Sequence, residues 1–240
     1  MKRKVQRRLR AATMFMLPVL SLSAQDKVEA DIGAELVSDY VWRGQDLGNI
    51  SVQPTASISY KGLWLSGWGT LGFDKDDTKE FDLTLGYGIK GFSISVTDYW
   101  FGDGAGYFHY DATNTSHVFE AQVGYDFDIL AINWFTNFAG CDGVNKQGKR
   151  AYSSYFSVTA PFRLGGLDWA FEVGAVPWAT SFYNQSGDDD FGANGFEVSN
   201  ISLAATKTLK ITDTYSLPVW AKAIWNPATE GAHFVFGVKL

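Results

Sequence analysis

Hydrophobic and polar residues alternate along residues 28–44, which read VEADIGAELVSDYVWRG. One face of this stretch holds Ala30, Ile32, Ala34, Leu36, Ser38, Tyr40 and Trp42, and the other holds Asp31, Gly33, Glu35, Val37, Asp39, Val41 and Arg43. A strand that crosses a membrane needs about 9 to 11 residues, with apolar side chains toward lipid and polar ones toward a lumen. The stretch therefore predicts a transmembrane strand with an aromatic-tipped lipid face and a charged lumen face.

Segments with the same period-two alternation recur along the rest of the chain. They span residues 52–60, 63–73, 81–90, 92–100, 118–127, 130–138, 152–160, 167–175, 196–209, 216–226 and 232–240. Alternation of this kind is typical of strands with two unlike faces. With the first stretch, the pattern predicts about twelve strands, with ten or eight as the alternatives, joined in turn by long polar loops and short turns.

This sorting of connections by length favours a membrane barrel. Outer-membrane barrels have long outer loops, short periplasmic turns and an even strand count. Because lipid offers the backbone no hydrogen-bond partner, the sheet must close, with the last strand paired to the first. A soluble lipocalin-type barrel has no reason to place Tyr and Trp near strand ends, where membrane proteins carry interfacial girdles. We therefore expect an all-β, closed, antiparallel up-and-down transmembrane barrel that forms a single domain over residues 25–240.

The first 24 residues have the plan of a secretory signal peptide. A basic head with six Lys and Arg precedes the apolar run from Ala11 to Leu22, and Ser23 and Ala24 supply small residues for cleavage. Such a basic, apolar and small-residue order is the mark of an export signal that is later removed. The sequence thus predicts export through the inner membrane to the outer membrane of a Gram-negative bacterium, with residues 1–24 cleaved.

Removal of that segment changes the charge of the protein. Six of the 20 Lys and Arg lie in it and none of the 26 Asp and Glu does, so the remainder has 14 basic and 26 acidic residues, a formal net charge of -12. Nucleic-acid binding needs a basic footprint and is disfavoured. The single Cys141 has no partner for an internal disulfide. Outside the signal segment there is no apolar run long enough for a helical membrane span.

Three motifs in the first part of the chain resemble a known family. The residues Ser38-Asp39-Tyr40-Val41-Trp42-Arg43-Gly44 are similar to the S-x-Y-x-F-R-G signature of the TorF-type porins, small bacterial outer-membrane barrels that were formerly a conserved hypothetical family. Residues 62–69 resemble that family's Gly-aromatic then Trp-Gly strand, and residues 80–87 its E-x-D then G-Y strand. The resemblance covers residues 30–100 and implies an outer-membrane barrel whose motif residues are Ser38, Tyr40, Trp42, Arg43 and Gly44. Trp42 stands where the family has Phe.

The closing segment predicts the partners of the barrel. Residues 234–240 alternate up to a terminal Leu240, and they resemble the signal that the barrel-assembly machinery recognises, although that signal ends in Phe. We expect outer-membrane lipid and this machinery as partners, and a monomeric barrel.

Ten ionisable residues are expected to face the lumen. They are Asp31, Glu35, Asp39, Arg43, Asp82, Glu120, Glu172, Lys222, His233 and Lys239. Because the last strand runs antiparallel to the first, Lys239 should lie near the level of Asp31, and Lys222 within reach of Glu35 or Asp39. These charges either pair to stabilise a plugged interior or line a water-filled passage whose acidic wall favours cations or small polar solutes.

A narrow porin-like channel is the function that the sequence favours. Inward-pointing Trp64, Trp68, Tyr155 and Trp220 would narrow its passage. The alternative is a structural or ligand-binding barrel that acts through its outer loops without conducting ions. Planar-bilayer conductance separates the two.

The sequence does not favour an enzyme, a cofactor or a metal site. The only histidines are His109, His117 and His233, and neither a G-x-S-x-G element nor a zinc-ligand spacing is present. The acidic runs 74–77 and 188–190 invite a calcium site, but they lack the spacing of an EF-hand loop, so solvated surface charge is the better interpretation.

Overall fold

The computed structural model describes residues 27–75, 77, 79–102, 104–185 and 191–240. The expected signal segment 1–24 and the acidic run 188–190 lie outside these residues. No helix within the described ranges has the length and apolar character that a membrane span requires.

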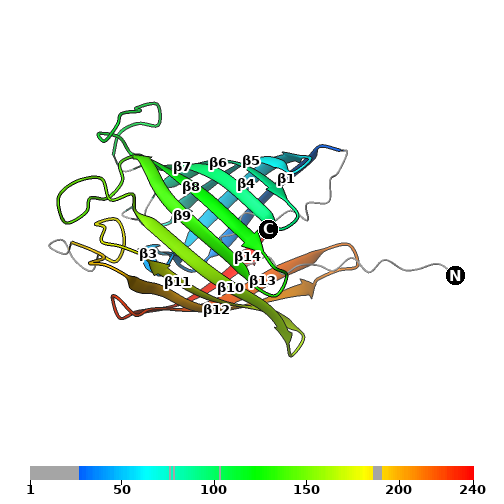
Figure 1. Cartoon of the computed structure of the whole chain (residues 1–240). Coiled ribbons are helices and arrows are strands. Elements are labelled where there is room, and N and C mark those ends of the chain that lie inside the picture. Colours follow the sequence, from blue (N-terminus) through cyan, green and yellow to red (C-terminus); the bar gives the residue numbers. More distant parts are fainter. Residues whose placement is uncertain (1–26, 76, 78, 103, 186–190) are drawn as a thin grey trace.

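Twelve antiparallel strands close into a barrel, and a two-stranded hairpin accompanies them (Figure 1). The strands in chain order are β1 (Glu29–Val37), β2 (Tyr40–Trp42), β3 (Gln45–Gly48), β4 (Ser51–Tyr60), β5 (Leu63–Gly72), β6 (Glu80–Ile89), β7 (Phe92–Phe101), β8 (His117–Asp126), β9 (Ala131–Gly140), β10 (Ser154–Leu164), β11 (Leu167–Val176), β12 (Glu197–Lys210), β13 (Ser216–Asn226) and β14 (Gly231–Lys239). Every barrel strand pairs with its chain neighbours, and β14 closes the sheet against β1. The expected closed up-and-down barrel of twelve strands is confirmed.

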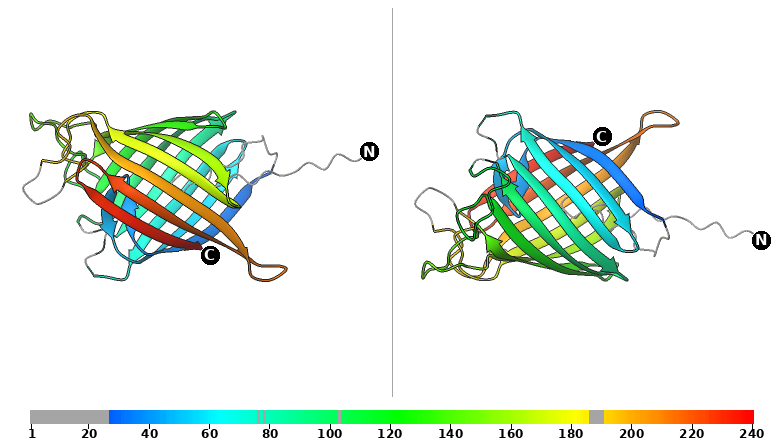
Figure 2. Two further views of the ribbon diagram at one scale, coloured as in Figure 1. Left: turned by 90° about the horizontal axis from the view of Figure 1, so that it is seen from below. Right: turned by 90° about the horizontal axis from the view of Figure 1, so that it is seen from above.

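The two ends of the barrel differ as the connection lengths predicted. The longer loops gather at one end of the barrel, and the two-residue turns lie at the other end (Figure 2). Lys61 and Gly62 have φ of 50° and 88°, and Lys90 and Gly91 have φ of 49° and 85°. Two successive residues with positive φ form the turn that matches the twist of the flanking strands, which is why glycine follows lysine in both.

The closing seam between β1 and β14 is short. Register pairs join Glu35–Val37 to Gly237–Lys239, and Glu35 lies opposite Lys239. The expectation that Lys239 lies near the level of Asp31 is wrong by four residues. The first residues of β1 extend past the end of β14, so Glu35 lies opposite Lys239 and Asp31 lies beyond it. Asp31 pairs instead with Ser57 of β4 and is exposed at the turn end of the barrel.

The outside of the barrel is apolar and the inside polar. Ile32 is 85% exposed and Phe236 54% exposed. Ser66, Thr84 and Glu120, which face the opposite way, are buried. A closed sheet with this inversion of the usual core is stable only where hydrocarbon covers its outer face. The chain is a transmembrane β-barrel.

Trp64, Tyr155 and Trp220 point into the barrel and pack on glycines of neighbouring strands, and Trp68 lies beside the Tyr40 ring. The Trp64 ring lies over Gly86, where a Cβ would come within 2.1 Å of it, and the Trp220 ring lies over Gly237, where a Cβ would come within 2.0 Å. Both glycines sit directly opposite their tryptophans in register. The rings thus lie flat on the wall, and the glycines make room for them.

Candidate functional site

The chain leaves the barrel wall at Ser38. The backbone N–H of Ser38 donates to the carbonyl oxygen of Phe236 at 2.9 Å, and the N–H of Phe236 donates to Ser38 Oγ at 2.9 Å. Beyond this point β2 pairs with β3 rather than with β14, and the two turn at Arg43 and Gly44, with φ of 52° and 83°. A Cβ on Gly44 would lie 1.8 Å from the carbonyl oxygen of Ser199, so the hairpin requires glycine there.

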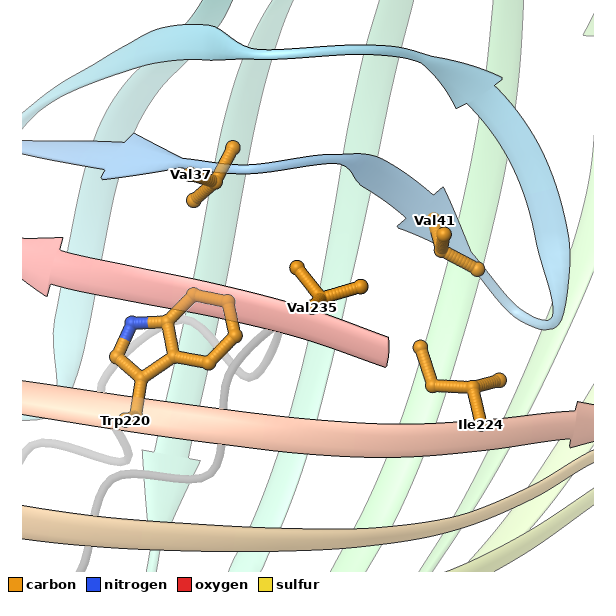
Figure 3. Packing of buried hydrophobic residues seen from close by; sticks show 5 residues of the cluster. All are labelled: Val37, Val41, Trp220, Ile224 and Val235. Atoms are coloured by element: carbon orange, nitrogen blue, oxygen red, sulfur yellow. The ribbon is translucent and has the colours of Figure 1, made fainter. Parts of the chain in front are cut away.

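The hairpin packs on the inner wall of the barrel. Val41 of β2 joins a buried apolar cluster with Val37 at the end of β1, Trp220 and Ile224 of β13, and Val235 of β14 (Figure 3). Trp220, Ile224 and Val235 of the wall point inward, and exposure of their apolar side chains to a water-filled lumen would be unfavourable. Their burial under β2 explains why the hairpin folds inward instead of extending the barrel.

The expectation of a single strand over residues 28–44 is therefore wrong beyond Val37. Tyr40 is 3% exposed and faces the interior, where its hydroxyl donates to Glu80 Oε2 of β6 at 2.8 Å. The rings of Tyr40 and Trp68 of β5 lie 5.5 Å apart. Trp42 lies in the interior too, stacked on Tyr183 at 5.8 Å. Neither aromatic residue meets lipid.

Arg43 occupies the centre of the interior. Its guanidinium makes a two-pronged contact with Glu120 of β8, at 2.6 Å from Nη1 and 2.8 Å from Nη2, and Nη1 also donates to the Tyr183 hydroxyl. The guanidinium carbon lies 4.1 Å from the centre of the Phe135 ring and 4.8 Å from that of Tyr155. The side chains of Arg43 and Glu120 are 8% and 2% exposed.

Charge and stacking together account for this arrangement. A buried guanidinium is tolerated only with a carboxylate partner and satisfied hydrogen bonds. Arginine suits the position because its planar fork fits a carboxylate and its faces stack on aromatic rings. Tyr99 Oη donates to Glu120 Oε1 at 2.8 Å and completes the shell of that carboxylate. Arg43 and Glu120, both expected to face the lumen, thus contact each other in the structure.

The β11–β12 connection folds over the same end. Tyr183 is fully buried, and Asn184 N donates to Gln45 Oε1 of β3 at 3.1 Å. Asn226 of β13 donates through Nδ2 to Asn184 Oδ1 and to the Gly44 carbonyl oxygen, both at 3.1 Å. The β11–β12 connection and the end of β13, far apart in the sequence, thus both hold the hairpin tip.

Hydroxyl and amide side chains make up most of the remaining inner wall, and its charged groups are mainly carboxyls. Asp82 and Glu80 lie on β6, and Glu172 of β11 accepts hydrogen bonds from Asn200 Nδ2 at 2.6 Å and from Thr159 Oγ1 at 3.2 Å. None of the three carboxyls forms an ion pair with a basic side chain in the described part of the chain. The interior therefore has an acidic wall around a neutralised Arg43.

The remaining basic residues lie apart from the expected partners. Lys222 lies opposite Val235 in register, and among described residues no ion pair joins it to Glu35 or Asp39. The imidazole Nδ1 of His233 lies 3.8 Å from Asp39 Oδ2 instead. The expectation for Lys222 is wrong because the chain turns inward at Ser38 and carries Asp39 away from the wall.

The other two histidines contact the β7–β8 loop. His117 shares an outward face with Phe119, and its Nδ1 lies 2.7 Å from Asp98 Oδ1 while Nε2 lies 2.6 Å from the Tyr107 carbonyl oxygen. With both ring nitrogens engaged, His117 holds the β7–β8 loop against the wall. His109 Nε2 contacts the carbonyl oxygen of Asn114 in that loop at 2.9 Å.

Sequence reasoning missed Glu80, Tyr99 and Tyr183. Glu80 had a signal, since it opens the E-x-D motif, and the structure brings that motif onto Tyr40 of the S-D-Y-V-W-R-G motif. Tyr183 had none, because it lies in an irregular loop 140 residues from Arg43.

A cavity of about 610 Å³ opens beside the hairpin at the loop end. Aromatic rings and amide side chains form much of its lining, which includes Trp42, Gln45, Asp46, Phe101, Phe182, Asn184, Asn226 and His233. A cavity of this size accommodates a small polar solute.

Comparison with solved structures finds other barrels at low similarity. A variant of OccD1 (OprD) is 10% identical with a TM-score of 0.39, and the match covers 89% of this chain and 65% of that one. OmpF of Salmonella typhi, in a complex with daunomycin, is 14% identical with a TM-score of 0.37, over 83% and 65% of the two chains. The outer membrane protein OprD from Pseudomonas aeruginosa is 11% identical with a TM-score of 0.36, over 88% and 64%. The chain thus spans somewhat less than two thirds of their length. No family model matches the sequence, and no curated protein is significantly similar to it.

Proposed function

We propose that the protein is a narrow outer-membrane channel for small polar solutes, with a preference for cations. The observation that carries the proposal is the inward hairpin in an acidic barrel. It narrows the lumen to a constriction around Arg43, whose charge Glu120 neutralises, while Glu80, Asp82 and Glu172 on the wall have no basic partner among the described residues. Rings of carboxyl groups favour cations in other pores.

Ion selectivity in planar bilayers tests this proposal. The refolded protein is expected to give discrete current steps. Under a KCl gradient across the bilayer, the reversal potential should have the sign that indicates a preference for K⁺ over Cl⁻. Glu172→Gln removes a wall charge and should move the reversal potential toward zero. Asp213→Asn, in an exposed turn between β12 and β13, is the matched control and should leave it unchanged. Anion selectivity would contradict the proposal.

A closed barrel that binds ligands through its outer loops is the second candidate. Tyr183 is 0% exposed and Tyr155 is 2% exposed. This burial favours the second candidate, because these rings and the hairpin fill the interior near the loops. A refolded barrel that shifts on heating in gels but carries no current under any voltage would support this candidate over the channel.

We further propose that the chain is a monomeric relative of the TorF-type porins in the outer membrane of a Gram-negative bacterium. The two halves of the motif resemblance meet in one contact, Tyr40 with Glu80, which gives the motifs a shared structural purpose. The exposed apolar faces of β14, with Phe234 and Phe236 outward, suit recognition by the barrel-assembly machinery. Fractionation and cross-linking of the exported protein test its location and its monomeric state.

A further inference from the structure

Three metal-ligating side chains converge at the loop end of the barrel, outside the Arg43 constriction. Asp39 lies between β1 and β2, Asp46 lies on β3, and His233 lies on β14. His233 Nδ1 is 3.8 Å from Asp39 Oδ2 and 3.9 Å from Asp46 Oδ2, and one ligand atom from each residue lies within 4.8 Å of the other two.

These separations suit an ion better than direct contacts. The two His233 distances are too long for hydrogen bonds. Two sides of the triangle are 3.8 and 3.9 Å and the third is at most 4.8 Å. An ion equidistant from its corners therefore lies at most about 2.5 Å from each, a few tenths of an ångström beyond the distances of about 2.0–2.2 Å at which imidazole and carboxylate ligands hold zinc. A small inward movement of exposed Asp46 closes that gap.

The Asp46 oxygen that faces His233 is available. Asp46 uses Oδ1 to accept from Gly48 N at 3.3 Å, so Oδ2 is the atom that faces His233. Among the described residues, neither carboxylate forms an ion pair with Lys or Arg. Asp46 and His233 also line the 610 Å³ cavity, so an ion held by three protein ligands keeps open positions for water or a solute on that side.

We propose that Asp39, Asp46 and His233 bind one divalent transition-metal ion, such as Zn²⁺ or Co²⁺, at the outer mouth of the barrel. The imidazole nitrogen selects these ions over Ca²⁺ and Mg²⁺, which prefer oxygen ligands alone. Binding requires no conductance. Where the channel proposed above operates, the site captures a metal cation ahead of the constriction.

Titration of the untagged, refolded barrel in detergent tests the site. Calorimetry with Zn²⁺ and visible absorption with Co²⁺ should each show one ion per chain, and Ca²⁺ should not compete at equal concentration. His233→Gln and Asp46→Asn should each weaken binding at least tenfold. His109→Gln and Asp213→Asn, a loop histidine and a turn carboxylate, are the matched controls and should bind as the parent does.

The outcomes separate this site from the channel function. The proposed site is overturned if the parent protein shows no stoichiometric binding, or if both site variants bind as tightly as the parent. Either result overturns the site even if potassium current is normal. Metal binding by a barrel that passes no current upholds the site and removes the channel. Asp46 is 56% exposed in its side chain, so Asp46→Asn should fold, and heat-modifiable gel migration verifies this.

Discussion

At the scale of single residues, Arg43 connects the hairpin tip to the barrel wall. Its guanidinium links β2 to β8 through Glu120 and packs against Phe135 of β9 and Tyr155 of β10. One residue thus ties the hairpin to three of the twelve wall strands. A positive charge is retained there because its carboxylate partner is equally buried, and each makes the other tolerable.

Truncation of Arg43 should be strongly destabilising. Arg43→Ala leaves the Glu120 carboxylate buried without its partner, and we expect a loss of about 3 kcal/mol in the free energy of unfolding. Arg43→Lys keeps the charge but loses the two-pronged contact and the stacking, so its loss should be smaller but measurable. Urea titration of the barrel in lipid vesicles, followed by tryptophan fluorescence, measures both.

A double-mutant cycle is the control for this pair. The double variant Arg43→Ala/Glu120→Ala should lose less stability than the two single variants combined, by at least about 1 kcal/mol, because neither charge is then left alone. Additive losses would show that the two side chains act independently and would contradict the interpretation.

At the scale of elements, the β2–β3 hairpin converts a wide barrel into a constricted one. Its apolar side is covered by Ile224 and Val235 of the wall, and its tip is held by Asn226. The barrel strands close without it, since β1 ends at Val37 and β4 begins at Ser51. The hairpin is therefore an insertion into the lumen rather than a part of the wall.

Replacement of residues 39–48 by a short Gly-Ser linker should widen the passage. We expect single-channel conductance in planar bilayers to rise several-fold, because the constriction disappears while the wall remains. A linker of equal length in the β7–β8 loop, at residues 104–110, is the control and should leave conductance near the parent value. An unchanged conductance after removal of the hairpin would place the constriction elsewhere.

The outer loops are held by carboxylates that accept backbone N–H groups. Asp77 accepts from Asn49 N at 3.0 Å and from Asp74 N at 2.9 Å, so it joins the β5–β6 loop to the start of β4. These donors lower the pKa of Asp77 below its ordinary value of 3.8. Asp77 thus has a structural contact that neither a calcium site nor plain surface charge had predicted.

The sign of the Asp77 shift predicts the pH dependence of this contact. A lowered pKa in the folded loop stabilises it at pH above about 4, and that stabilisation disappears as the pH falls through the lowered pKa. Hydrogen exchange at the Asn49 amide should therefore accelerate relative to neighbouring strand amides below about pH 4. Asp77→Asn should show fast exchange already at pH 7. Equal protection in the variant and the parent at pH 7 would refute the role of Asp77.

At the scale of the whole molecule, the barrel has its apolar surface outside and its polar groups within. Adjacent residues of one strand consequently differ in their tolerance of charge. Ala56 of β4 is exposed on the outer face, and Thr55 beside it faces the lumen at the same depth.

Lysine at these two positions gives a matched comparison. Ala56→Lys places a charge in hydrocarbon and should destabilise the folded barrel in vesicles by about 2–4 kcal/mol in the free energy of unfolding. Thr55→Lys places the same charge toward the acidic interior and should have a much smaller effect. Urea titration in vesicles measures both, and equal losses would contradict the assigned faces.

The sequence by itself determined the barrel. Period-two alternation identified every wall strand, because each has one face in lipid and one in a polar lumen, and lysine-glycine pairs such as Lys61–Gly62 marked the tight turns. The membrane faces of Ile32 and Phe236 follow from the same alternation, and the exposure of both side chains confirms them. Local patterns suffice for features that the surrounding solvent imposes on each strand separately.

Only the tertiary structure decided what fills the barrel. Alternation continues unbroken from β1 to Arg43, since an apolar side chain has the same appearance in a sequence whether lipid or Val235 covers it. The partners that turn the hairpin inward lie far along the chain, with Glu120 77 residues from Arg43 and Tyr183 140 residues away. Contacts at such separations exist only once the sheet has closed, because closure alone brings these residues together.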